Sequence, residues 1–341
     1  MDITAHIFHL KSRYPFRITH GTRTETATFI VELHEGLLTG FGEATPVPYY
    51  GITPADMLAL LEEHRSAITG FSWTHPADLW THLRPLIGEN HFLQCALDIA
   101  AYDLWAKRHG KTVYQMLGLD ISRIPCSNYT IGMDEIPEMV RKMKEFDFPV
   151  YKIKLGTSHD LEIVEALRQE TDAVFRVDAN TAWTVEQTIV FSEKMKALGV
   201  EFIEQPLKPG DFAGMKEVMK YTALPVIADE SCITEEDVPK CVGFFSGINI
   251  KLAKCGGITP ALRMIQQARE HSMKVMMGCM TESSIGISAI AQLLPLLDFV
   301  DMDGALLIAN DPAEGVYLDK GRAVFPDRPG TGAFLKEIPA L

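Results

Sequence analysis

Three acidic residues each end a short apolar run, and they recur at nearly equal spacing along the chain. The runs read FRVD, FIE and VIAD, and their acids are Asp178, Glu204 and Asp229. From Asp178 to Glu204 is 26 positions, and from Glu204 to Asp229 is 25. One β-strand with its return helix and two loops takes about that many residues, so we expect the acids at successive strand ends of a parallel sheet.

Carboxylates at neighbouring strand ends can act together on one cation. If the sheet closes into a barrel, adjacent strands lie about 4.8 Å apart and the three side chains converge. Hard oxygen ligands without a nearby His or Cys suit Mg²⁺ better than Zn²⁺. One acid of this kind alone would more simply be a helix N-cap at the start of a βα loop. Three acids in phase favour a magnesium site.

Two further strand ends carry lysines that would flank this site. The first, YKIK, ends at Lys154, and the second, NIK, ends at Lys251. Strand alternation places Lys152 on the same side as Lys154, and Asn249 on the same side as Lys251. As the second and sixth strands of an eight-stranded barrel, the two segments face each other across its mouth. A single lysine at a strand end usually just reaches solvent, and that reading stays open for either lysine alone.

The elements that would position these groups begin near Pro125, where β-rich and helical stretches start to alternate. Eight candidate strands and about seven helices recur every 20 to 27 residues, which is typical of an α/β barrel. The expected strands are Cys126–Ile131, Val150–Leu155, Val174–Asp178, Glu201–Glu204, Pro225–Ala228, Gly247–Lys251, Lys274–Gly278 and Phe299–Asp301.

The chain before Pro125 lacks this alternation. Strands over 3–8 and 28–33, followed by helices from Pro54 and over 92–104, indicate a separate α+β domain. We therefore expect an α+β domain at 1–124, a catalytic barrel at 125–311, and a Gly- and Pro-rich segment at 312–341 that packs back on the first domain.

Composition excludes several classes of partner. The 341 residues carry a net charge of −13, which argues against nucleic acid and against an anionic membrane surface. The six cysteines contain no C-x-x-C pair, as expected for reduced thiols in a cytoplasmic protein. No basic region followed by an apolar one opens the chain, and no apolar run reaches the roughly 18 residues of a membrane span. We expect a cytoplasmic enzyme, and the sequence leaves open a homo-oligomer.

The lysines, the three acids in this order, the DES segment at 229–231 and the NIK segment at 249–251 together resemble the enolase superfamily. The closest resemblance is to its muconate-lactonizing subgroup, and it covers essentially the whole chain. It implies a modified TIM barrel, (β/α)7β, with an α+β capping domain built from the N-terminus and the C-terminal tail. It also implies a Lys base and a magnesium-stabilised enediolate.

The expected chemistry is proton transfer at a carbon next to a carboxylate. Mg²⁺ held by Asp178, Glu204 and Asp229 would neutralise the enediolate as its charge develops. Lys154 and Lys251, one on each face, would remove the proton and return one from the opposite side, which inverts the stereocentre. Each can accept a proton only when neutral, and we expect desolvation, the metal and the neighbouring lysine to lower its pKa. Lys152 would help to hold the substrate carboxylate.

The eighth strand narrows the substrate. It ends FVDMD, which puts Asp301 and Asp303 on the same side, and a pair of anions at a barrel mouth calls for a cation such as an α-ammonium. Within the superfamily an Asp-x-Asp at this place is similar to that of the dipeptide epimerases, although a solvated loop or helix cap would also explain it. The resemblance adds Thr130 and the segment Cys279, Met280 and Thr281 as residues that line the dipeptide.

The specificity loop departs from the family pattern. Members selective for an acidic C-terminal residue carry an arginine there, whereas the matching position in this chain is near Gly21. His20 or Arg23 could still reach a substrate. We expect a hydrophobic residue at the second position of an Ala-Xaa dipeptide, with L-Ala-D/L-Glu epimerisation as the alternative.

Other reactions suit the same residues. A cycloisomerase or an o-succinylbenzoate synthase-like lyase would use the same lysines without needing Asp301 and Asp303. A different class, a metal-free Schiff-base aldolase, would use Lys154 or Lys251 as its nucleophile. A non-enzymatic sugar or peptide binder would need neither lysine.

Overall fold

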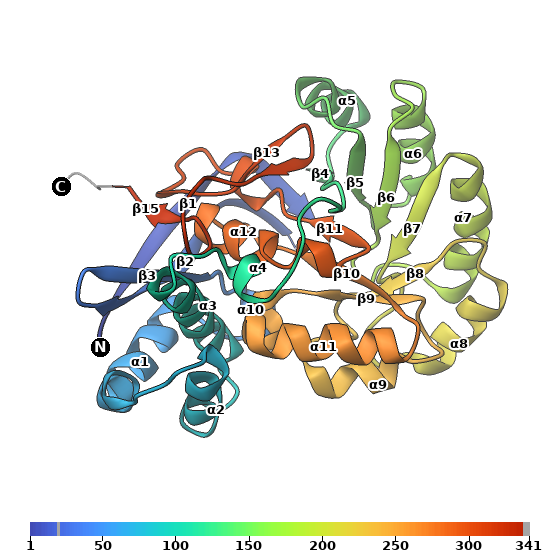
Figure 1. Ribbon diagram of the computed structural model, residues 1–341. Helices are drawn as coiled ribbons and strands as arrows, with labels where there is room; N and C mark the ends of the chain where they lie inside the picture. The colour runs from blue at the N-terminus through green and yellow to red at the C-terminus, as the bar shows by residue number, and fades with distance from the viewer. Residues whose placement is uncertain (19–20, 337–341) are drawn as a thin grey trace.

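The structure is a computed structural model that describes residues 1–18 and 21–336. A parallel barrel makes up one side of the molecule, and an antiparallel sheet with three helices makes up the other (Figure 1). No helix within the described ranges is long and apolar enough to cross a lipid bilayer.

The barrel has eight parallel strands in sequence order, so each strand pairs with the next along the chain. The strands are β4 (Tyr129–Ile131), β5 (Val150–Lys154), β6 (Val174–Asp178), β7 (Val200–Glu204), β8 (Val226–Ala228), β9 (Gly247–Ile250), β10 (Lys274–Gly278) and β11 (Phe299–Asp301). The parallel bridge Ser127 to Val300 joins the segment just before β4 to β11. The predicted modified TIM barrel with a capping domain is confirmed.

Helices cover the outside of the barrel (Figure 1). They are α5 (Ile136–Glu145), α6 (Asp160–Arg168), α7 (Val185–Ala197), α8 (Phe212–Tyr221), α9 (Val238–Cys241), α10 (Leu252–Cys255), α11 (Ile258–Glu270) and α12 (Ser284–Ala291). Helix α7 shows why the sequence folds this way, because Thr184 and Gln187 form a reciprocal capping box at its start. It buries Thr188, Ser192 and Met195 and leaves charged residues outside.

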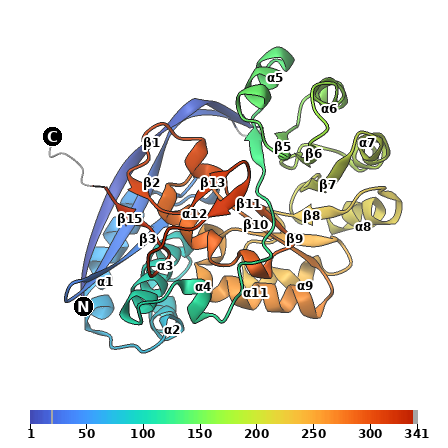
Figure 2. The same ribbon diagram turned by 45° about the horizontal axis from the view of Figure 1, so that its top comes forward.

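The capping part is built on the hairpin of β1 (Asp2–Ile18) and β2 (Gly21–Glu35), with β3 (Leu38–Ala44) beside it. Helices α1 (Pro54–Gly70), α2 (Pro76–Ile87) and α3 (His91–Arg108) follow, and the short α4 spans Val113–Met116. The hairpin is far longer than the strands predicted over 3–8 and 28–33. Its outer arm, residues 11–18 and 21–27, is rich in charged side chains and lacks the sustained alternation of apolar and polar residues that indicates a half-buried strand. The arm reaches the barrel, where Arg13 N donates to Leu307 O at 2.8 Å (Figure 2).

Glycines let β3 lie directly on α3. A Cβ added at Gly42 would stand 1.9 Å from Ala96 O, and one at Gly40 would stand 2.3 Å from Ala100 O. Only a residue without a side chain allows two backbones to approach so closely. The contact fixes the position of β3 and of the residues that follow it.

The last part of the chain runs back along the capping sheet. It contains β12 (Ala313–Glu314), β13 (Tyr317–Asp319), β14 (Arg322–Val324) and β15 (Phe334–Leu335). Ala313 and Ala333 share a buried cluster with Ile30 of β2 and Ile285 of α12. Thr331 N also donates to Asp103 Oδ1 of α3 at 2.6 Å.

Candidate active site

The three predicted acids come together at the carboxyl ends of adjacent strands. Asp178 and Glu204 are register partners at the ends of β6 and β7, and Asp229 directly follows β8. One carboxylate oxygen from each of the three lies within 4.8 Å of the others. All three side chains are buried.

Neighbouring amides and a lysine hold the acids in place. Asn249 Nδ2 donates to Glu204 Oε1 at 2.8 Å, and Lys254 Nζ donates to Asp229 Oδ1 at 2.6 Å. Gln205 Oε1 accepts from the backbone N–H of Asp229 at 3.0 Å, which fixes the turn after β8. The sequence contains no pattern that would pick out Gln205, which follows β7, or Lys254 of α10, because each contacts Asp229 from a distant part of the chain.

The backbone bends sharply where the acids leave their strands. Asn180, Thr181 and Gln205 have φ angles of 43°, 67° and 34°, in the left-handed region that residues with side chains rarely adopt. The turn brings the Asn180 N–H to Asp178 Oδ1 at 2.9 Å. Such strain concentrates at functional sites, where the surrounding structure holds it.

The donor set fits Mg²⁺. Glu204 Oε2 is buried and accepts no hydrogen bond within the described residues, although it forms an ion pair with Lys152 Nζ at 2.8 Å. Burial and the charge of Asp178 raise the pKa of Glu204 to about 7. A cation would stabilise the charged form of a carboxylate in this position. Three carboxylates without His or Cys are also the ligands that Mg²⁺ prefers.

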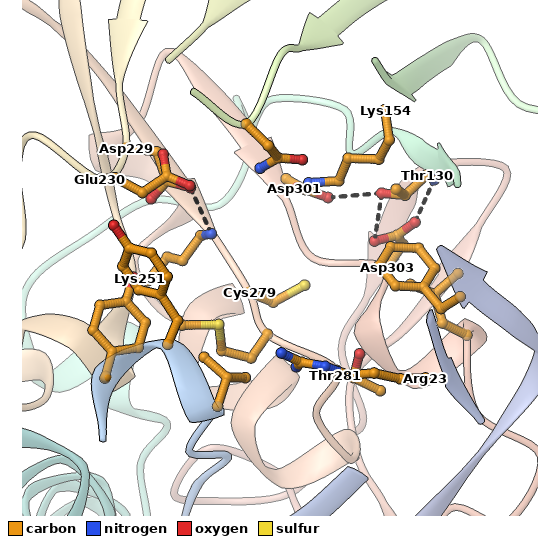
Figure 3. Close-up of a pocket in the computed structure, with 17 residues that line it drawn as sticks. Arg23, Thr130, Lys154, Asp229, Glu230, Lys251, Cys279, Thr281, Asp301 and Asp303 are labelled. Atoms are coloured by element: carbon orange, nitrogen blue, oxygen red, sulfur yellow. Dashed lines mark hydrogen bonds and ion pairs between the residues drawn. The ribbon is translucent and has the colours of Figure 1, made fainter. Parts of the chain in front are cut away.

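The predicted base lysines lie on opposite sides of the site. Lys154 Nζ contacts Asp178 Oδ2 at 2.6 Å, and Lys251 Nζ contacts Asp229 Oδ2 at 2.8 Å. Figure 3 shows Lys251 beside Asp229 and Lys154 toward Asp301, with the cavity between them. Burial lowers the pKa of Lys251, but the neighbouring negative charges, with Asp229 the largest of them, together raise that pKa well above its usual value. The lowered pKa that we predicted for Lys251 therefore requires the charge of Asp229 to be neutralised.

Lys152 lies deeper than the other two lysines. Its side chain is 1% exposed, and its Nζ stands 2.8 Å from Glu204 Oε2, 2.9 Å from Asp301 Oδ2 and 3.4 Å from Asp178 Oδ2. It connects the acid cluster with the end of β11 and is not among the residues that line the cavity. Its predicted contact with a substrate carboxylate stays a prediction.

A cavity of about 130 Å³ opens between the two lysines. Of the predicted residues it is lined by Lys154, Lys251, Asp229, Thr130, Cys279, Met280, Thr281, Asp301, Asp303 and Arg23. Residues that we did not predict also line it, and they are Phe16, Val47, Tyr49, Tyr50, Asn180, Glu230 and Leu307. Gly21 begins β2 and is not part of the lining, and His20 lies outside the described residues. The cavity is therefore walled by both the barrel and the capping part.

Asp301 and Asp303 meet Thr130 at one end of the cavity (Figure 3). The Thr130 N–H donates to Asp303 Oδ2, and its hydroxyl lies 3.3 Å from Asp303 Oδ1. Burial and the charge of Asp301 raise the pKa of Asp303 well above its usual value. Burial also disfavours the charge of Asp301, but its neighbours, above all Lys152 and then Lys154 and Asn128, together lower the pKa of Asp301. The pair thus carries its negative charge mainly on Asp301, which suits one cation.

Arg23 enters the cavity from the capping hairpin. It pairs with Phe16 across β1 and β2, and both residues line the cavity. Burial lowers the pKa of Arg23, and no carboxylate within residues 1–18 and 21–336 forms an ion pair with it. A partly desolvated guanidinium of this kind favours an anionic partner.

Comparison with known proteins agrees with this geometry. Residues 2–118 match the model of the mandelate racemase / muconate lactonizing enzyme N-terminal domain, and residues 135–338 match that of the enolase C-terminal domain-like family. The chain is 49% identical to an L-Ala-D/L-amino acid epimerase of Flavobacterium johnsoniae, over 98% of this chain and 100% of that protein. It is 50% identical to one of Maribacter sp., over 99% of this chain and 100% of the other.

A solved structure shares the whole architecture. The dipeptide epimerase from Cytophaga hutchinsonii, complexed with Mg and the dipeptide D-Ala-L-Val, superposes with a TM-score of 0.91. The two are 27% identical, and the match covers 99% of this chain and 97% of that one. Because both family models match and relatives near half identity span its length, the chain belongs to the mandelate racemase / muconate lactonizing enzyme family of the enolase superfamily.

Proposed function

We propose that the protein is a magnesium-dependent dipeptide epimerase that inverts the Cα of the C-terminal residue of an Ala-Xaa dipeptide. The observation that carries the proposal is the placement of Lys154 and Lys251 on opposite sides of one cavity, each beside an acid of the three-carboxylate cluster. The relatives of nearly half identity are named for the same reaction, and the solved relative binds Mg and a dipeptide.

The proposed ligands of the metal are Asp178, Glu204 and Asp229. When bound, Mg²⁺ would neutralise these acids and stabilise the negative charge that develops on the substrate carboxylate. One lysine, as the neutral amine, then takes the Cα proton, and its N–H bond forms as the C–H bond breaks. The other lysine, as the ammonium, gives its proton to the opposite face of the planar carbon. Each turnover moves one proton off and one on, and the configuration inverts.

Asp301 and Asp303 are the proposed receptor for the α-ammonium of the first residue. Thr130 of β4 holds Asp303, and the segment Cys279, Met280 and Thr281 also lines the cavity, with Cys279 Sγ within 4.8 Å of a carboxylate oxygen of each aspartate. Lys152 would assist with the substrate carboxylate from beneath the acid cluster. A free amino terminus is thereby part of the proposed specificity.

The second residue of the dipeptide faces a mixed wall. Val47, Tyr49 and Phe16 from the capping part supply apolar surface, which supports the expected hydrophobic Xaa. Arg23 on the same wall supports Ala-Glu as a second substrate class, because a partly buried guanidinium binds a carboxylate well. We propose that both classes are accepted.

The organisation of the whole protein follows the same proposal. The capping domain would comprise 1–124 and the tail 312–341, and the catalytic barrel would comprise 125–311. We propose a cytoplasmic enzyme that needs neither nucleic acid nor membrane, and the proposal leaves open a homo-oligomer.

Exchange of the Cα proton in deuterated water tests the two-base assignment. We expect Lys154→Met and Lys251→Met each to lower epimerisation by about 10²- to 10⁴-fold, as loss of a general acid or base does. Each variant should still exchange the Cα proton of one configuration, the one whose proton faces the remaining lysine. Lys216→Met, which changes an exposed lysine on α8, serves as the control.

Other results would redirect the assignment. Exchange of both configurations by either single variant would contradict a base on each face. Loss of water without any exchange of a dipeptide would favour the lyase reading, and trapping of substrate by borohydride in the presence of chelator would favour a Schiff-base aldolase.

A further inference from the structure

Asn128 is fully buried just before β4 and contacts Asp301 from the side away from Lys152. Its Nδ2 donates to Asp301 Oδ1 at 2.8 Å, and Lys152 Nζ donates to Asp301 Oδ2 at 2.9 Å. Each carboxylate oxygen thus has its own donor. The plane of the Asp301 carboxylate is fixed from both sides, while the residue still lines the cavity.

Arg176 in turn fixes the orientation of Asn128. Its Nη1 donates to Asn128 Oδ1 at 3.4 Å and to Val300 O at 2.9 Å, and its Nε donates to Glu201 Oε2 at 2.8 Å. Because the guanidinium can only donate, the oxygen of the amide must face Arg176 and its NH₂ must face Asp301. The chain of contacts leaves the amide one orientation.

This arrangement matters for where the negative charge of the acidic pair resides. Asp303 receives two contacts from Thr130, whereas Asp301 receives the ammonium of Lys152, the amide of Asn128 and a distant contact from Thr130. A donor that prefers the charged carboxylate stabilises the anion on the residue it contacts. Asn128 therefore helps to keep the charge on Asp301 and to keep its free lone pairs directed into the cavity.

We infer that Asn128 is a positioning residue for recognition of the substrate's free amino terminus, acting through Asp301. The inference rests on the proposed function, in which Asp301 and Asp303 bind the α-ammonium of the dipeptide. Asn128 itself does not line the cavity, so its effect reaches the substrate through the residues that it holds: Asp301 at 2.8 Å and, by a longer contact of 3.4 Å, the hydroxyl of Thr130.

A purely structural role for Asn128 is the competing explanation. It lies at the seam between β4 and β11, next to the Ser127 to Val300 bridge that joins the segment just before β4 to β11. Loss of a seam contact would weaken binding of every substrate alike. Loss of a contact that orients Asp301 would weaken only substrates that carry an ammonium group.

The test compares an Ala-Xaa dipeptide with the corresponding N-propionyl amino acid, which has the same shape without the ammonium. The ratio of kcat/KM for the two, measured by Cα proton exchange, reports recognition of the amino terminus. We expect Asn128→Leu to lower this ratio by about tenfold, the order supplied by one hydrogen bond to a charged group. Asn128→Ala removes the donor without adding a charge, so it should lower the ratio by a similar factor.

Tyr151→Phe is the matched control. Tyr151 is a buried barrel residue whose hydroxyl contacts Met143 O and Phe146 O near α5, away from the cavity. Its ratio should equal that of the unmodified protein. If both Asn128 variants leave the ratio unchanged, the positioning role is overturned. This holds also where kcat/KM falls by the same factor on both substrates.

Failure of the proposed function gives a different result. If the unmodified protein shows no preference for the ammonium-bearing substrate, or if Asp301→Asn keeps the preference of the unmodified protein, then the acidic pair is not the receptor, and the inference falls with it. A preference that is present in the unmodified protein, lost in Asp301→Asn and intact in both Asn128 variants overturns the role of Asn128 alone.

Discussion

Arg23 is the residue through which the capping hairpin can influence the choice of substrate. It is half-buried on the cavity wall, and no carboxylate in the described part of the chain pairs with it. We expect Arg23→Met to lower kcat/KM for Ala-Glu by about 10- to 100-fold, because one charge-assisted contact contributes about 1.5–3 kcal/mol. The rate on Ala-Val should change little, since an apolar side chain gains nothing from the guanidinium. Epimerisation rates on the two dipeptides, measured side by side, check this.

Arg17→Met provides the control for this change. Arg17 is an exposed arginine on the same hairpin and does not line the cavity. Its loss should leave the preference between Ala-Glu and Ala-Val as it was. An equal fall on both dipeptides in Arg23→Met would instead mean that Arg23 only supports the shape of the wall.

At this scale the sequence predicted the residues whose types carry charge and whose positions follow strand ends. Asp178, Glu204 and Asp229 could be found because a barrel repeats its strand ends at a regular spacing. Asn128 and Gln205 could not, because each acts by a hydrogen bond to a residue on another strand, and a single amide in the sequence shows no period.

At the scale of elements, Glu43 of β3 ties the capping sheet to the start of α12. Its Oε1 accepts from Thr28 Oγ1 at 2.7 Å and from Ser283 N at 3.0 Å. Its Oε2 accepts from Ser283 Oγ at 2.5 Å and from Gly286 N at 2.9 Å. The carboxylate is 1% exposed, so these donors have no access to water. The segment just before Ser283 includes Met280 and Thr281 of the cavity wall, so this contact also supports the site.

Replacing this carboxylate by an amide tests its importance. The backbone N–H groups of Ser283 and Gly286 contact different oxygens of Glu43. In Glu43→Gln the NH₂ group must therefore face one of these two N–H donors, whichever way the amide turns. A buried donor left without an acceptor costs about 1–3 kcal/mol, and we expect a loss of that size in the free energy of unfolding. Urea denaturation measures it.

Asp311→Asn is the corresponding control for Glu43→Gln. Asp311 accepts hydrogen bonds from Ser284 N and Oγ at the start of the same helix, but the Asp311 side chain is partly exposed to solvent. Water can replace its contacts, so the loss should be smaller than 1 kcal/mol, in the range of about 0.5–1 kcal/mol for an ordinary hydrogen bond. A Glu43→Gln variant no less stable than Asp311→Asn would show that the capping sheet is held mainly by apolar contacts.

The elements themselves were predictable where their period was regular. All eight barrel strands were identified, since each is a short apolar run between helical stretches. The outer arm of the β1–β2 hairpin was missed, because it is stabilised by strand pairing and by contacts with the barrel such as Met133 N to Arg17 O at 3.0 Å. Such contacts between distant segments leave no alternation in the local sequence.

For the whole molecule, the active site is the place where buried charge opposes folding. The oxygens of three buried carboxylates lie within 4.8 Å of one another, and buried lysines supply the positive charge that faces them. Like charges at this distance are costly away from water. The three acids lie at the ends of strands of one barrel, so their repulsion lowers the free energy of unfolding of the whole fold.

A cation that binds the folded chain alone should therefore raise the temperature of unfolding. Linkage gives about 2.7 kcal/mol of stabilisation at a hundredfold excess over the dissociation constant. We expect the melting temperature to rise with the Mg²⁺ concentration and to fall in EDTA, as followed by circular dichroism. Glu204→Gln should abolish the Mg²⁺ response, and in EDTA it should melt no lower than the unmodified protein because it removes one of the opposed charges. Glu201→Gln is the control, because Glu201 lies on the same strand but pairs with Arg176, and this variant should keep the full rise in melting temperature with Mg²⁺. If the melting temperature of Glu204→Gln rises with Mg²⁺ as much as that of Glu201→Gln, the cation binds elsewhere.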